Sequence, residues 1–98
     1  MPDRDPLSDA AIHDALDDLD GWTYEDDKLK TTYEFADFRA AISFIVRMSY
    51  HAEEMNPHPE LENVYNTVSI ALTTHDAGGK VTQTDVELAS KIEEFVWT

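Results

Sequence analysis

Apolar and polar side chains alternate in two separate parts of this sequence, and that alternation constrains the fold more than any other feature. Every second residue is apolar or threonine from Leu29 to Phe35, and Val68, Ile70 and Leu72 repeat the pattern. A period of two predicts strands with one face on a core. A shorter strand-like run precedes each of these, with a turn between them: residues 22–24 precede the first run and residues 61–65 precede the second. The sequence therefore predicts two β-hairpins.

Three segments outside these hairpins have helical periodicity and helix start signals. Ser8 is a predicted N-cap, and the helix after it ends near Gly21. Asp37 is the predicted cap of a second helix that extends to about Met55. Thr82 and Asp85 have the spacing of a capping box at the start of a third helix. The predicted element order is αββαββα.

The second helix has more apolar residues than one buried face requires. A stripe at helical spacing predicts the buried set as Phe38, Ala41, Ile42, Ile45, Met48, Ser49 and Ala52. Phe44, Val46 and Tyr50 fall outside this stripe. They indicate a second apolar contact, either a subunit interface or a broad helix face under the sheet.

Length and element order together indicate the fold class. A chain of 98 residues supplies one domain with one hydrophobic core. Hairpins combined with helices predict an α+β sandwich, in which three helices pack on one face of a four-stranded antiparallel sheet. We expect residues 1–98 to form this single domain, with residues 1–6 as a loose arm.

The chain is strongly acidic, with 21 Asp and Glu against 7 Lys and Arg and a formal net charge of -14. Such a surface disfavours nucleic acid and anionic membranes as direct partners, because both present negative charge. It is typical either of a solvated acidic surface or of adaptation to high salt. The chain has no cysteine. It also shows no long apolar run and no secretory signal, so we expect a cytoplasmic protein.

Two of the four histidines occupy special positions. His58 lies between Pro57 and Pro59 in "NPHPELENVYN", residues 56–66, where the two prolines restrict the backbone. His75 follows the last strand of the same hairpin. Since the start of one hairpin strand lies beside the end of its partner, we expect the two imidazoles to be neighbours.

Two neighbouring imidazoles favour paired proton transfer, with one acting as acid and the other as base. Metal binding is a weaker interpretation, because a third ligand would have to come from His51, Glu53 or Asp76 and the sequence has no HExxH spacing. Each histidine taken alone could also be a structural residue. The sequence contains no Gly-x-Ser-x-Gly elbow and no phosphate-binding loop.

The second half of the chain resembles a known family. Residues 52–93, "AEEMNPHPELENVYNTVSIALTTHDAGGKVTQTDVELASKIE", are similar to the pterin-4a-carbinolamine dehydratases. Their pattern is A-E-x-x-N-H-H-P-E-W-x-N-V-Y-N, followed by a strand, T-H-D, a Gly-Gly turn and D-x-x-L-A. "GW" at residues 21–22 and "FADF" at residues 35–38 extend the resemblance weakly.

The resemblance implies dehydration of 4a-hydroxytetrahydropterin to quinonoid dihydropterin, without a metal or redox cofactor. His58 matches the second histidine of His-His-Pro, and His75 matches the T-H-D histidine. The family's acidic positions correspond to Glu53 and Asp85, which we expect to orient a histidine or hold structure. Two further supporting residues are Asp76, in T-H-D, and Trp22, which either walls the pocket or packs in the core.

The chain departs from the family pattern at two positions. Pro57 replaces the first histidine of His-His-Pro, and Leu61 replaces the tryptophan after Pro-Glu. His51 could substitute in part for the missing imidazole, although a two-histidine site is the simpler interpretation. The resemblance also implies a homodimer or homotetramer. The alternative to an enzyme is a family member that serves as an oligomeric binding, coactivator or assembly protein.

Overall fold

The computed structural model describes residues 5–55 and 59–97, with Asp76 described by its backbone alone. The elements follow in the order α1 (Asp9–Leu16), β1 (Thr23–Glu25), β2 (Lys28–Glu34), α2 (Phe38–Met55), β3 (Glu60–Val64), β4 (Thr67–Leu72), the 3-10 helix η2 (His75–Ala77) and α3 (Gln83–Phe95). This order confirms the predicted αββαββα arrangement and the α+β class.

The four strands form one antiparallel sheet in the order β1-β2-β4-β3. Both predicted hairpins are present, and β2 pairs with β4 in the centre, with Leu29 opposite Leu72. The first hairpin turns at Asp26 and Asp27, whose φ angles of 54° and 62° are both positive. Two-residue hairpin loops favour such angles, because they match the twist of the flanking strands.

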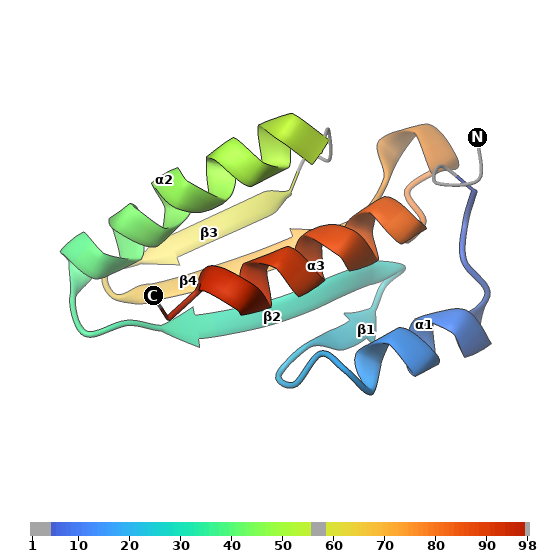
Figure 1. Ribbon diagram of the computed structural model, residues 1–98, viewed down its shortest axis with the longest axis horizontal. Coiled ribbons are helices and arrows are strands. Elements are labelled where there is room, and N and C mark those ends of the chain that lie inside the picture. The colour runs from blue at the N-terminus through green and yellow to red at the C-terminus, as the bar shows by residue number, and fades with distance from the viewer. Residues whose placement is uncertain (1–4, 56–58, 98) are drawn as a thin grey trace.

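The helices lie against one face of the sheet, with α2 and α3 side by side over its centre and α1 beside β1 (Figure 1). Alternate strand residues on that face are buried: Leu29, Thr31, Tyr33, Val68, Ile70 and Leu72. The opposite face carries residues such as Lys30, Thr32 and Ser69, which keep contact with solvent. The period-two pattern therefore predicted the core face of both central strands.

All three predicted helix starts are confirmed by hydrogen bonds. Ser8 Oγ accepts a bond from the Ala11 N–H at 3.1 Å, and Asp37 Oδ1 accepts one from the Ala40 N–H at 2.8 Å. At the start of α3, Thr82 and Asp85 form the predicted capping box. Each bond satisfies a backbone donor that the first turn of a helix leaves without a partner.

The buried face of α2 differs from the predicted stripe. Ala41, Phe44, Met48 and Ala52 are buried, whereas Phe38 is 49% and Ile42 38% exposed. Phe44 packs in an aromatic cluster with Tyr33 and Phe35, at ring-centroid distances of 5.6 and 5.2 Å. The prediction is confirmed for Ala41, Met48 and Ala52 and wrong for Phe38, Ile42 and Ser49, which are exposed. Apolar residues occur on several sides of this helix, so that periodicity alone fits more than one face.

The predicted loose arm does not extend to Pro6. This residue forms a β-bridge with Thr82, and the next amide, Leu7 N–H, donates to Val81 O at 2.9 Å. Residues 1–4 lie outside the described part of the chain. Within the part that is described, no helix is both long and apolar enough to cross a membrane.

Candidate functional site

One end of the sheet gathers the segments that carry the predicted site. In the β3–β4 hairpin, Glu60 pairs with Ala71, so the first residue of β3 lies beside the end of β4. The C-terminal end of α2 and the turn that contains η2 lie at this same end of the sheet (Figure 1). Pro57 and His58 fall outside the described residues, so the predicted contact between His58 and His75 stays a prediction.

His75 is the first residue of η2 and is exposed to solvent. The turn around it is closed by backbone bonds to Thr74, which donates to Lys80 O at 2.9 Å and accepts from Ala77 N–H and Gly79 N–H, each at 3.1 Å. Gly78 and Gly79 have φ angles of 73° and 76°, a conformation that favours glycine. The imidazole therefore projects from a turn whose backbone is fixed.

A buried cluster of Thr74, Thr82 and Asp85 anchors this turn to α3. The fully buried Asp85 carboxylate accepts the Thr82 N–H at 2.9 Å and the Thr74 hydroxyl at 2.7 Å. The Thr74 and Thr82 hydroxyl oxygens lie 2.8 Å apart. Because Thr74 immediately precedes His75, Asp85 fixes the backbone that carries the histidine.

The tip of the first hairpin holds the other side of the turn. Thr73 Oγ1 donates to Asp27 O at 3.2 Å, and Lys80 Nζ lies 2.8 Å from Asp27 Oδ2. The Lys80 ammonium holds the pKa of Asp27 below its usual range, and the same bond raises the pKa of Lys80. Burial, followed by a hydrogen bond to Asp27, raises the pKa of Tyr24.

Trp22 packs in the core, where it is 5% exposed. Its Nε1–H donates to Glu93 Oε2 at 3.3 Å, and the Tyr33 hydroxyl donates to the same oxygen. Burial, and then this bond to Glu93, raises the pKa of Tyr33. The three side chains join α3 to β2 and to the segment before β1. The sequence left two roles open for Trp22, in the core or at the wall of the pocket. The structure shows it in the core, and a role at the pocket wall stays a prediction.

Glu53 and His51 leave α2 in different directions. Glu53 is exposed, whereas the half-buried His51 ring stacks on Phe95 of α3 at a centroid distance of 4.7 Å. Among the residues described, no three histidine, aspartate or glutamate side chains come together as a metal site. The side chain of Asp76 is outside that description.

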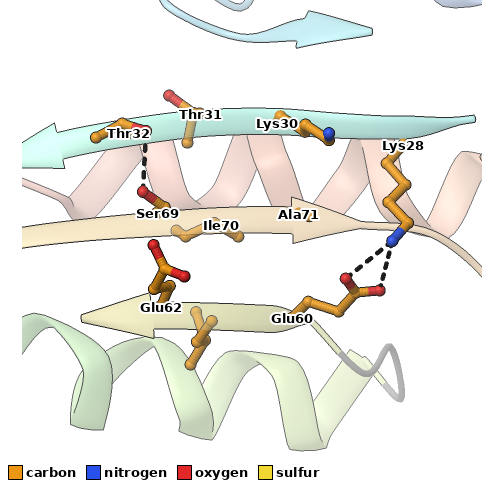
Figure 2. Close-up of a pocket in the computed structure, with 10 residues that line it drawn as sticks. Lys28, Lys30, Thr31, Thr32, Glu60, Glu62, Ser69, Ile70 and Ala71 are labelled. Atoms are coloured by element: carbon orange, nitrogen blue, oxygen red, sulfur yellow. Dashed lines mark hydrogen bonds and ion pairs between the residues drawn. The ribbon is translucent and has the colours of Figure 1, made fainter. Parts of the chain in front are cut away.

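The face of the sheet opposite the helices carries a hollow of about 440 Å³ between β2 and β3, over β4 (Figure 2). Small side chains on β4, among them Ser69 and Ala71, form its floor. Lys28 Nζ crosses the floor to contact both oxygens of Glu60 at 2.9 Å. Among the lining residues that the structure describes, none is a histidine. The chemistry of proton transfer therefore points to the His75 end of the sheet rather than to this hollow.

Sequence reasoning missed several residues that hold the His75 turn. Thr82 was identified only as a helix cap. Asp85 was identified as part of that cap and, from the resemblance, as a residue that orients a histidine or holds structure, but its bond to Thr74 was not predicted. The signal was a threonine directly before the histidine, since a buried hydroxyl needs a partner. The contact between Asp27 and Lys80 joins residues far apart in the sequence and gave no local signal.

Comparison of this sequence with known proteins identifies similar proteins in one family. The family model "Pterin 4 alpha carbinolamine dehydratase" matches residues 5–95. A provisionally named pterin-4-alpha-carbinolamine dehydratase of Opitutus terrae is 52% identical over 91 residues, covering 93% of this chain and 94% of that protein. A protein of the same provisional name from Rhizorhabdus wittichii is 46% identical over 91 residues, covering 91% and 93%.

A solved structure shares the fold. The Brucella melitensis protein described as "transcriptional coactivator/pterin dehydratase" superposes with a TM-score of 0.86 at 33% identity, covering 92% of this chain and 97% of that one. Its description names both a transcriptional coactivator and a pterin dehydratase.

Proposed function

Because this chain belongs to the pterin-4a-carbinolamine dehydratase family, we propose that it is a hydro-lyase that dehydrates 4a-hydroxytetrahydropterin to quinonoid dihydropterin. This reaction would serve the recycling of tetrahydropterins. The substrate is a small pterin, and the step needs proton transfer at two positions. The carbon–oxygen bond at C4a breaks with both its electrons going to oxygen, which leaves as water.

In the proposed step, one imidazole protonates the departing 4a-hydroxyl and the other removes a proton from a ring nitrogen of the pterin. The electron pair of that N–H bond then forms the new double bond to C4a. His58 and His75 are the proposed pair, since histidines serve as general acids and bases near neutral pH. The proton lost from nitrogen balances the proton gained by the hydroxyl.

The observation that supports this proposal is the exposed position of His75 on an anchored turn. Its backbone is fixed by Thr74 and Asp85 on one side and by Asp27 and Lys80 on the other. A surface histidine without a role does not require such anchoring. The turn also lies at the end of the sheet where β3 begins (Figure 1). In the sequence, β3 begins two residues after His58.

A second candidate function is an oligomeric binding, coactivator or assembly role without catalysis. Two observations favour it: Pro57 replaces a motif histidine, and the Brucella melitensis protein is described as a coactivator as well as a dehydratase. In either case we propose a homodimer or homotetramer located in the cytoplasm. Direct binding to nucleic acid is disfavoured by the net charge of -14.

The proposal predicts that the purified protein accelerates the disappearance of 4a-hydroxytetrahydropterin generated in the cuvette. Replacement of His75 by alanine should lower this activity by about 10²-fold or less. This is at or below the lower end of the range for one acid–base group, because the uncatalysed elimination also proceeds. His58→Ala should have a comparable effect. Activity should be measured in dilute buffer and in multimolar salt, given the acidity of the chain.

His13→Ala is the matched control, because His13 is an exposed histidine on α1 and should retain the wild-type rate. Folded His58→Ala and His75→Ala proteins with full activity would contradict proton transfer by these side chains. A wild-type protein that is inactive at both salt concentrations would support the non-catalytic function instead.

A further inference from the structure

The two aspartates at the tip of the first hairpin share a backbone conformation but hold different parts of the chain. Asp26 and Asp27 have φ angles of 54° and 62°, which residues other than glycine rarely adopt. The carboxylate of Asp26 pairs with Lys30, within the same hairpin, at 3.3 Å. The carboxylate of Asp27 pairs with Lys80, 53 residues away in the sequence, at 2.8 Å. Asp27 therefore connects the hairpin to the turn that carries His75.

Asp27 contacts that turn on both sides of the histidine. Its carbonyl oxygen accepts the hydroxyl of Thr73, which precedes His75 in the turn, at 3.2 Å. Its carboxylate holds Lys80, which follows His75. The two sides also bond to each other, because the Thr74 N–H donates to Lys80 O at 2.9 Å within a β-bridge. A fixed Lys80 therefore fixes the peptide that precedes the histidine.

The Asp27 carboxylate has a defined orientation, because both of its oxygens are bonded. Oδ2 binds Lys80, and Oδ1 accepts the Tyr24 hydroxyl from β1 at 3.2 Å. The Tyr24 ring in turn meets the His13 ring of α1 edge-on, at a centroid distance of 6.5 Å. The hairpin tip lies at the same end of the sheet as η2 (Figure 1). Since a lysine side chain is flexible, a carboxylate held in this way limits its motion and that of the turn.

We infer that Asp27 is a positioning residue for His75, and that it acts through Lys80 on the turn that carries the imidazole. This inference rests on the proposed function, in which His75 exchanges a proton with the substrate. Neither Asp27 nor Lys80 is a fixed position of the family pattern. Both side chains are half-exposed, and exposed ion pairs add little to overall stability. The expected effect is on geometry, because a reacting group misplaced by about 1 Å can cost about 10²-fold in rate.

Replacement of Asp27 by glycine isolates the role of the carboxylate. Asp27→Gly keeps the backbone carbonyl and leaves Asp-Gly at the tip, a pair that two-residue hairpin turns favour, so folding is not at risk. We expect kcat to fall by about tenfold, less than for a full displacement, because the bond between Thr74 and Asp85 remains. KM should change little, since Asp27 acts on the position of His75 and not on substrate binding.

Asp26→Gly is the matched control for Asp27→Gly. It also removes an ion pair and also places glycine at a positive φ, but the pair it removes lies within the hairpin. This variant should keep the wild-type kcat and KM. The comparison therefore separates the contact with the turn from any general effect of a change at the hairpin tip.

Variants of Lys80 test whether Asp27 acts through this side chain. Lys80→Met removes the charge and should lower kcat to the same extent as Asp27→Gly. Lys80→Arg keeps a cation that can pair with the carboxylate and should retain most of the wild-type rate. The double variant Asp27→Gly/Lys80→Met should be no slower than either single variant, because the two substitutions remove one and the same contact.

Hydrogen exchange at the amides of Ala77 and Gly79 gives a measurement that needs no substrate. Both amides donate to Thr74 O, and both should exchange several-fold faster in Asp27→Gly than in Asp26→Gly because the turn opens more often. Equal exchange in the two variants would contradict the inference.

Steady-state rates distinguish failure of this inference from failure of the proposed function. An active wild-type protein in which Asp27→Gly turns over as fast as Asp26→Gly would overturn the positioning role and leave the dehydratase proposal intact. A wild-type protein without dehydratase activity would overturn the proposed function. Asp27 would then anchor the turn without positioning a catalytic group.

Discussion

Replacement of Asp85 by alanine should lower the free energy of unfolding by about 3–5 kcal/mol. The carboxylate is fully buried and accepts bonds from the Thr82 N–H and the Thr74 hydroxyl. Loss of a helix cap costs about 0.5–2 kcal/mol, and each buried donor left without a partner costs about 1–3 kcal/mol. Urea denaturation followed by circular dichroism measures the change.

Glu87→Ala is the matched control for Asp85→Ala, since Glu87 is an exposed acidic residue on the same helix; it should change stability by no more than about 0.5 kcal/mol. Asp85→Asn should fall between the two, because Thr74 and Thr82 donate to one oxygen, Oδ2, and the amide oxygen of asparagine can still accept at that position. A loss below 1 kcal/mol for Asp85→Ala would mean that the cluster does not hold the turn before His75.

The second large effect concerns Pro57, one of the two positions where the chain departs from the family pattern. Pro57→His restores the His-His-Pro sequence of the resemblance and should raise the catalytic rate by about 10²-fold, the lower end of the range for one acid–base group. At 1.36 kcal/mol per tenfold, this corresponds to about 2.7 kcal/mol of transition-state stabilisation. Replacing the proline lowers the free energy of unfolding by only about 0.4–1 kcal/mol through chain entropy. The expected gain in transition-state stabilisation is larger than this loss of stability.

Pro57→Ala separates these two contributions, because it removes the proline without adding an imidazole. Steady-state rates of both variants should be compared with wild type, with melting curves to establish that each is folded. A folded Pro57→His protein with unchanged or lower turnover would indicate a site built around two histidines, or a protein without this activity.

Much of the fold could be predicted because its determinants are local. The hairpins follow from alternation within a few residues, and the Ser8, Asp37 and Thr82 caps follow from side chains that bond three residues ahead. The buried face of α2 could not be predicted in the same way. Phe44 lies in the core because its ring packs against Tyr33, on β2, and Phe35, just after β2. Periodicity within the helix carries no information on these contacts.

The candidate site shows the same division. The β3–β4 register that brings the start of one strand beside the end of the other is a property of a hairpin, and the pairing of Glu60 with Ala71 agrees with it. The bonds from Trp22 and Tyr33 to Glu93 join residues 71 and 60 positions apart. Such contacts depend on how α3 lies across the sheet, which no short stretch of sequence specifies.

The turn of the first hairpin has a consequence for how this protein responds to its solvent. Asp26 and Asp27 both adopt positive φ, a conformation that costs a residue other than glycine about 1 kcal/mol or more. Each aspartate forms an ion pair with a lysine, Asp26 with Lys30 and Asp27 with Lys80. These pairs are exposed, so mobile ions screen them. The backbone of the hairpin tip is therefore unfavourable at any salt concentration, whereas the ion pairs that stabilise the tip become weaker as salt is added.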